Sequence, residues 1–217
     1  MTSKTARRLI WVPIIHTQAD LGSVSGAVKA LYARKIGLKK WNQHVATIEE
    51  LWNTICEEIQ RLNLDYGKVR LYQDGLPNCG QELRIVKDMI EVGSRNHSLL
   101  MELVEKGARL VGTESPELLI EEYELVRGAL KSLETSGTGT LNRQQAQRSR
   151  EILKKRDCYI AERIDDTLQT GETGLIFLGM LHRLNESLPH DIRLSILSLS
   201  ASRHSKDAPR QRKDRNP

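Results

Sequence analysis

Short runs of apolar residues alternate along the chain with longer segments in which apolar residues recur every three or four positions. The runs are typical of buried strands and the longer segments of amphipathic helices. The predicted strands are 9–15, 68–73, 108–113, 174–181 and 192–199. The predicted helices are 27–36, 47–62, 82–106 with a bend near Gly93, 116–133 and 142–168. This alternation predicts an α/β fold, with a mostly parallel sheet and helices on both faces.

Two of the predicted helices begin with recognisable capping signals. Thr47 and Glu50 have the spacing of a capping box, which places the start of one helix at Thr47. Ser115 is followed by Pro116 and Glu117, an N-cap residue with proline at the first helical position and an acid in the first turn. These signals set the expected boundaries of both helices.

The length of 217 residues fits one domain better than two. We predict an N-terminal extension over residues 1–8, a single α/β domain over 9–200 and a disordered tail over 201–217. The polar, glycine-containing segment 135–140 is predicted to be a loop, with a mobile lid as the alternative.

The net charge of +5 is concentrated at the C-terminus, because residues 201–217 hold six Lys or Arg residues against two Asp residues. The preceding part of the chain is close to neutral. Nucleic-acid binding is therefore expected at most weakly and through the tail, with salt-dependent affinity. The sequence leaves open whether the chain forms a homodimer.

Cysteine usage and hydropathy predict a cytoplasmic protein with no membrane association. The three cysteines are an odd number without Cys-x-x-Cys spacing, as expected of reduced thiols. The apolar run 9–15 contains Pro13 and is too short for a secretion signal, and no later run approaches the ~20 residues of a membrane span.

Polar side chains that can bind metals or transfer protons follow four of the predicted strands. They are His16, Asp74, Glu114 and His182. The carboxyl ends of parallel strands meet at one edge of a sheet, where ligands bind, so we expect these residues to form a site there. The alternative is that the acids belong to surface turns and that each histidine is a hydrogen-bonded structural residue.

Arg156 interrupts the apolar face of a predicted helix, since Ile152, Ile160 and Ile164 share its four-residue spacing. A buried guanidinium needs a carboxylate or an anionic ligand beside it. Asp157 is a candidate for the same polar cluster. The alternative is that the Arg156 stem packs on the core while its head reaches solvent.

Three of these features together resemble the TraB, ChaN and erythromycin-esterase-like superfamily. They are His16 followed by Asp20 and Ser23, the Arg156-Asp157 pair, and Gly179 followed at the third position by His182. The resemblance extends over most of residues 9–199. The resemblance matches His16 and His182 to the first and last histidines of the superfamily's motifs, and Arg156 to the arginine of its helix motif.

The residues and the resemblance together predict a hydrolase that acts on a small-molecule or peptide substrate. The predicted catalytic residues are His16, Asp74, Glu114, Arg156 and His182. His16, His182 and Glu114 are predicted to hold a divalent metal, and their chemistry suits Zn, Mn or Fe. The alternative is a non-catalytic regulatory module that binds a small molecule or a metal at the same site.

Overall fold

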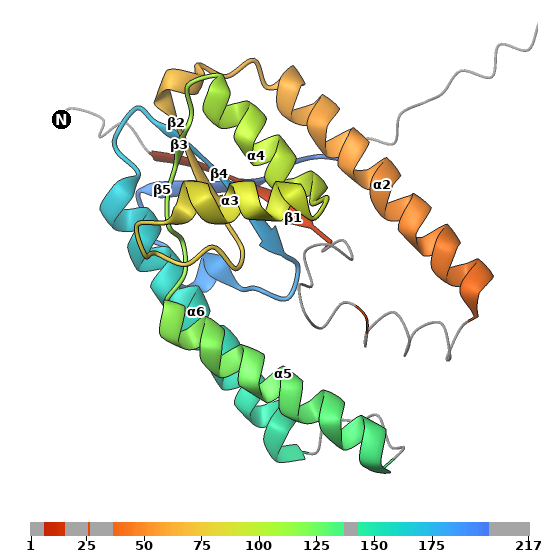
Figure 1. The fold of residues 1–217 in the computed structure, drawn as a ribbon. Coiled ribbons are helices and arrows are strands. Elements are labelled where there is room, and N and C mark those ends of the chain that lie inside the picture. Colours follow the sequence, from red (N-terminus) through yellow and green to blue (C-terminus); the bar gives the residue numbers. More distant parts are fainter. Residues whose placement is uncertain (1–6, 16–25, 27–36, 137–142, 200–217) are drawn as a thin grey trace, which may run out of the picture.

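The protein is described by a computed structural model that covers residues 7–15, 26, 37–136 and 143–199. It contains a five-stranded sheet in the order β3-β2-β4-β1-β5, and every strand pair is parallel. Helices cover both faces of this sheet (Figure 1). The predicted α/β class is confirmed.

The strands and helices follow the predicted order. The strands are β1 Arg7–Ile14, β2 Val69–Gln73, β3 Arg109–Leu110, β4 Thr173–Gly179 and β5 Ile192–Ile196. The helices are α2 Leu38–Arg61, α3 Glu82–Glu91, α4 Arg95–Glu105, α5 Pro116–Ser136 and α6 Arg143–Thr167, with short 3-10 turns η2 Tyr66–Lys68 and η3 Leu184–Glu186.

The predicted boundaries differ from these in a few places. β1 begins at Arg7, inside the predicted extension 1–8, and α5 continues to Ser136, into the predicted loop 135–140. The predicted helix 27–36 and the predicted tail 201–217 lie outside the described residues.

The predicted capping box at Thr47 is wrong, because α2 begins nine residues earlier, at Leu38. Gly37, with a φ of 86°, precedes the first turn, and Trp41 already packs in the buried interior. The Thr47 hydroxyl donates to the carbonyl of Gln43 at 3.0 Å, one turn back in the same helix. A side chain engaged in this way lies inside a helix and does not cap its start.

The predicted bend within 82–106 is a complete break between α3 and α4. Gly93 has a φ of 89°, a conformation that favours glycine. Ser94 caps the next helix by accepting a hydrogen bond from the His97 amide. The break turns α4 so that Leu99, Leu100 and Leu103 pack into the core.

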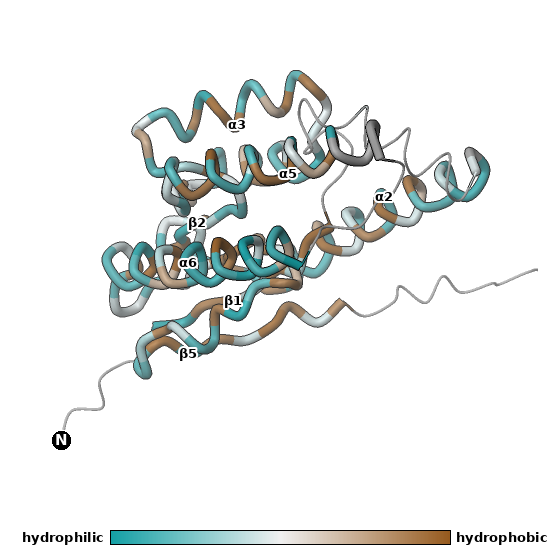
Figure 2. The backbone as a smooth tube through the Cα atoms, turned by 90° about the horizontal axis from the view of Figure 1, so that it is seen from below, coloured by the Kyte–Doolittle hydropathy of each residue, from teal (hydrophilic) through white to brown (hydrophobic). Residues whose placement is uncertain are grey.

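The two faces of the sheet belong to two hydrophobic clusters. Ile10, Val12 and Ile14 of β1 point to the face packed by residues of α2, α3 and α4. The alternate residue Leu9 points to the face packed by α6. In Figure 2 the helices alternate between hydrophilic and hydrophobic stretches, as expected of helices with one face on a sheet.

Strand order explains why the helices divide in this way. The chain moves toward one edge of the sheet from β1 to β2 and β3, and then back across it to β4 and β5. Parallel crossovers have a strong right-handed preference, so a reversal of direction moves the connection to the opposite face. This agrees with α2, α3 and α4 on one face and α6 on the other.

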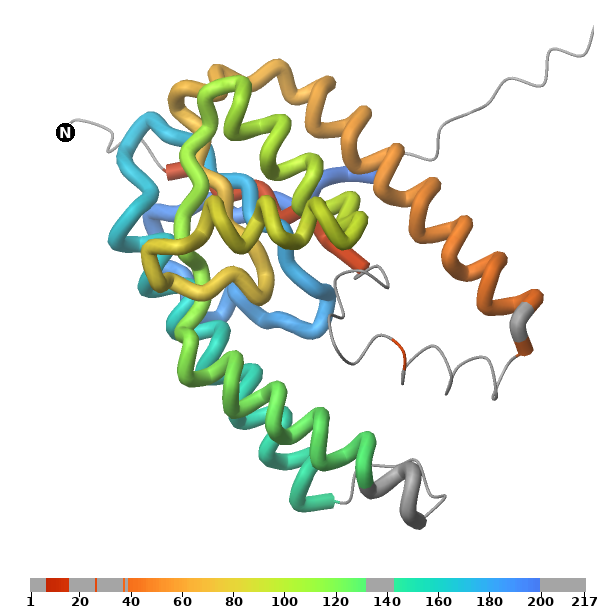
Figure 3. Tube along the Cα trace, viewed as in Figure 1, coloured from red at the N-terminus to blue at the C-terminus, as the bar shows by residue number. Residues whose placement is uncertain are grey.

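The reversal also locates a crevice at the carboxyl end of β4. Connections from β4 and from its neighbours β1 and β2 leave on opposite faces, and ligands bind at such a point in open α/β sheets. Figure 3 shows β1, coloured red, beside β5, coloured blue, so the first and last described strands are neighbours in the sheet.

None of the helices within the described ranges combines the length and the apolar character needed to cross a membrane.

Candidate functional site

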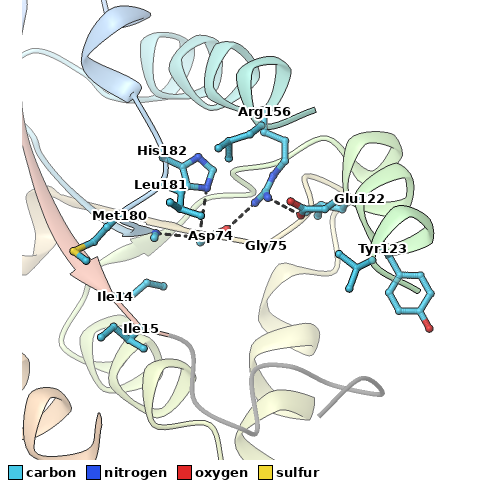
Figure 4. A pocket seen from close by; sticks show the side chains of 14 residues that line it. Ile14, Ile15, Asp74, Gly75, Glu122, Tyr123, Arg156, Met180, Leu181 and His182 are labelled. Atoms are coloured by element: carbon cyan, nitrogen blue, oxygen red, sulfur yellow. Dashed lines mark hydrogen bonds and ion pairs between the residues drawn. The ribbon is translucent and has the colours of Figure 1, made fainter. Parts of the chain in front are cut away.

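A cavity of about 620 Å³ opens at the carboxyl edge of the sheet, in the crevice beside β4. Residues that follow β1, β2 and β4 form part of its wall, and α5 and α6 form the remainder. The lining residues are Ile14, Ile15, Asp74, Gly75, Leu119, Glu122, Tyr123, Val126, Leu153, Arg156, Gly179, Met180, Leu181 and His182. Figure 4 shows Arg156 and His182 both directed at Asp74.

Asp74 is the centre of the polar part of this cavity. It follows β2 directly, and Gly75, with a φ of 75°, turns the chain away behind it. The Asp74 Oδ1 atom accepts from Arg156 Nη2 at 2.7 Å, and Oδ2 accepts from the Gly179 amide at 3.0 Å. Asp74 therefore connects β2 to the end of β4 and to α6.

Gly179 allows this close approach because it has no side chain. A Cβ atom at this position would lie 3.2 Å from Asp74 Oδ2, tighter than most such contacts. The Gly179 amide donates to that same oxygen at 3.0 Å. The glycine at the end of β4 thus fixes the carboxylate of Asp74 over the sheet edge.

Arg156 is buried and paired with three carboxylates. Its Nε and Nη2 atoms donate to Glu114 Oε2 and Oε1 at 2.9 and 2.5 Å, and Nη1 donates to Glu122 Oε2 at 2.6 Å. With Asp74 as the third partner, the Arg156 side chain is only 5% exposed. Burial alone would lower the pKa of Arg156, but these carboxylates, led by Glu114, outweigh it and raise the pKa. Arg156 is therefore a permanent cation.

Glu114 is a supporting residue beneath the cavity. Its side chain is completely buried and it does not line the cavity wall. Its Oε1 atom also accepts from the Gly75 amide at 3.2 Å, so it holds the turn that carries Asp74. A buried carboxylate needs such partners, and Arg156 supplies the opposite charge.

His182 lies between two carboxylates. Its Nδ1 atom is 2.6 Å from Asp157 Oδ1, and its Nε2 atom is 3.6 Å from Asp74 Oδ2. Burial lowers the pKa of His182, but Asp157 and then Asp74 outweigh that effect and raise the pKa to about 9. The imidazole is therefore protonated at neutral pH and carries a positive charge.

The two nitrogen atoms of His182 have different roles. Nδ1 is fixed by Asp157, whose second oxygen, Oδ2, accepts from the Arg183 amide at 3.0 Å. The separation of 3.6 Å between Nε2 and Asp74 is longer than a hydrogen bond. Because His182 also lines the cavity, its Nε2 proton can be offered to a bound molecule.

Four of the five predicted catalytic residues come together, because Asp74, Glu114, Arg156 and His182 form one connected network. Ile152, Ile160 and Ile164 are buried beside Arg156, as the helical spacing predicts. His16, the fifth residue, lies outside the described part of the chain.

The sequence did not reveal Glu122, which reaches Arg156 from α5. Glu122 lies three residues after Leu119 and four before Val126, so helical spacing places it on the same face as these apolar residues and could have distinguished it from Glu121 and Glu124. Asp157 was expected near Arg156, but its contact with His182 was not predicted. Both contacts depend on how the helices pack over the sheet, which local patterns do not specify.

The predicted metal ligands have other partners in this arrangement. Both oxygens of Glu114 accept from Arg156, and Nδ1 of His182 is paired with Asp157. Within the described ranges, no group of three His, Cys, Asp or Glu side chains is arranged to hold a metal ion. Glu114 here is the counter-ion of Arg156, and the metal site with His16 stays a prediction.

Comparisons with protein-family models, with curated proteins and with solved structures found no match for this chain.

Proposed function

We propose that the protein is a hydrolase that cleaves an ester or amide bond of a small molecule or peptide bound in the cavity. The observation that carries this proposal is the placement of His182, held at Nδ1 by Asp157 and facing Asp74 with Nε2 at the cavity wall. A positioned proton donor beside a carboxylate is the arrangement that general acid–base catalysis requires.

In the proposed reaction, a water oxygen bonds to the substrate carbonyl carbon while Asp74 Oδ2 takes one of its protons. The bond from that carbon to the departing oxygen or nitrogen then breaks. His182 gives the proton on Nε2 to the departing atom. The proton held by Asp74 passes to His182 across the separation of 3.6 Å, which restores both groups.

Arg156 and Glu114 support this chemistry by holding Asp74 in place. Arg156 holds Asp74 Oδ1 at 2.7 Å, which leaves Oδ2 directed toward His182. Glu114 fixes Arg156 in turn through both of its oxygens. A network fixed in this way keeps the reacting groups in place before the substrate binds.

The first experiment is a turnover screen of the purified protein with p-nitrophenyl esters, aminoacyl p-nitroanilides and p-nitrophenyl phosphate. Hydrolysis of an ester or anilide is expected, with a kcat ~10²–10⁴-fold lower in His182→Ala. His190→Ala is the matched control, because His190 is exposed on the same part of the chain and outside the cavity. Full activity of His182→Ala would rule out this site as the catalyst.

The pH profile gives an independent test of the role of His182. The proposed reaction needs the protonated imidazole, so kcat should fall as the pH rises through about 9. Asp157→Asn removes a carboxylate that raises the pKa of His182, so the fall should move to lower pH. An alkaline limb that is identical in both proteins would contradict the assignment.

The described hydrogen bonds of the Arg156 guanidinium all end on carboxylates of the protein, which favours a second candidate function, a binding module without catalysis. The three carboxylate partners of Arg156 form a closed network of the kind that also serves only to stabilise a fold. This candidate predicts ligand binding with no turnover in the screen.

A further inference from the structure

The cavity combines one charged wall with an apolar remainder. The charged side chains are Asp74, Glu122, Arg156 and His182. The apolar residues, which come from β1, α5, α6 and the turn after β4, are Ile14, Ile15, Leu119, Val126, Leu153, Met180 and Leu181. Sites of this kind bind molecules that carry an apolar body and a small polar group.

The charges of the network decide which polar group fits. Arg156 and the protonated His182 supply two positive charges, and four carboxylates contact them. The network therefore carries an excess of two negative formal charges. In a cavity partly shielded from water, such an excess attracts cations and repels anions.

Arg156 does not offset this excess toward a ligand. Every described hydrogen bond from its guanidinium ends on a carboxylate, so an anion would first have to displace one of them. Arg127 on α5 does not line the cavity, and its half-exposed side chain is paired with Glu124 at 2.9 Å.

Glu122 is the carboxylate best placed to meet a bound cation. Its Oε2 atom accepts from Arg156, and no described hydrogen bond or ion pair involves its Oε1 atom. Its side chain is one third exposed, at 33%, whereas those of Asp74, Glu114 and Asp157 are at most 8% exposed. Glu122 also lines the cavity, where Figure 4 shows it beside Arg156.

From the charge excess, the free oxygen of Glu122 and the apolar walls, we infer that the cavity takes an organic cation: a protonated amine joined to an alkyl or aryl body. The amine lies against Glu122 and Asp74, and the body packs on the residues that follow β1 and β4. This inference rests on the proposed function only in placing the ligand in the same cavity, and it names the substrate class of that site.

The test is calorimetric binding of three probes of equal length, octylammonium, octanol and octanoate, at pH 7. We expect octylammonium to bind at least tenfold more tightly than octanoate, with octanol between them. Ethylammonium should bind more weakly than octylammonium, because it lacks the apolar body. Equal or tighter binding of octanoate, or no binding of octylammonium, would overturn the inference.

Glu122→Gln should remove most of the preference for octylammonium over octanoate. Glu121→Gln is the control, since it removes the same charge from the adjacent position on α5, where the residue pairs with Arg148 outside the cavity. Loss of the preference in the control but not in Glu122→Gln would contradict the inference.

The binding test and the turnover screen can give opposite results, which distinguishes failure of the cation site from failure of the hydrolase. Binding of octylammonium that depends on Glu122, with no hydrolysis of any ester or anilide, would support the cation site and reject the hydrolase. Hydrolysis that depends on His182, with no preference for cationic over anionic probes, would support the hydrolase and reject the cation site.

Discussion

The polar network has two halves that meet at Asp74 and differ in kind. On one side, Arg156 is held by Glu114, Asp74 and Glu122, is always charged and has its described donors on carboxylates. On the other side, His182 is fixed at Nδ1 but has an Nε2 atom 3.6 Å from its nearest carboxylate. The first half is closed and the second is open to the cavity.

The two halves therefore differ in what they can contribute, one to the stability of the site and the other to proton transfer. A buried guanidinium with three carboxylates cannot change its charge at accessible pH, so its role is to hold those carboxylates in place. A histidine with a pKa of about 9 can gain and lose a proton, and His182 lines the cavity with its Nε2 atom 3.6 Å from Asp74. We therefore expect changes on the Arg156 side to act mainly on stability, and changes on the His182 side to act mainly on proton transfer.

The largest expected effect is on stability, in Arg156→Met. The substitution leaves the completely buried Glu114 without its counter-ion and removes one of the two cations beside the nearly buried Asp74. Removing one partner of a buried pair costs ~3–5 kcal/mol, so the free energy of unfolding in urea should fall by about that amount. Adding Glu114→Gln should recover part of the loss, because it removes one of the stranded charges.

Arg148→Met is the control for this experiment. Arg148 pairs with Glu121 between α6 and α5, but its side chain is 57% exposed. Exposed pairs contribute ~0–1 kcal/mol, so this variant should be close to the unchanged protein. Equal losses of unfolding free energy in Arg156→Met and Arg148→Met would show that the buried network stabilises the fold no more than an exposed ion pair does.

The next effect is the pH dependence of stability that His182 contributes. Its pKa is raised from 6.5 in the unfolded chain to about 9 in the fold. The resulting stabilisation is fully present below pH 6.5 and is lost as the pH rises through about 9, and it amounts to ~3 kcal/mol. The difference in unfolding free energy between the unchanged protein and His182→Gln should shrink between pH 6 and pH 10. A constant difference would contradict the raised pKa.

The smallest effect concerns the turn that carries Asp74. Gly75 has a φ of 75°, so Gly75→Ala places a side chain in a conformation that costs ~1–2 kcal/mol. Gly128→Ala on α5 is the matched comparison, because Gly128 is exposed and a Cβ there meets no atom within 4 Å. It should stabilise the helix by ~1 kcal/mol. Opposite signs in thermal unfolding are expected, and a stabilising Gly75→Ala would be evidence against the tight turn.

The sequence predicted the parts of the site that depend on regular local patterns. Strand ends placed Asp74, Glu114 and His182 at one edge, and four-residue spacing placed Arg156 on a buried face. Glu122 was not predicted, although its spacing from Leu119 and Val126 places it on an apolar face of α5; its contact with Arg156 depends on how the helices pack. The sequence also misplaced the start of α2, since Thr47 lies inside the helix and its hydroxyl bonds to the preceding turn instead of capping.

The most direct test of the account is the pKa of His182, measured by NMR titration of its imidazole in the unchanged protein and in Asp157→Asn. We predict a pKa of about 9 in the unchanged protein and a clearly lower value in the variant, since the hydrogen bond to Asp157 is the largest single effect that raises it. A pKa close to 6.5 in the unchanged protein, or equal values in both, would contradict the claim that His182 is a cation poised between two carboxylates.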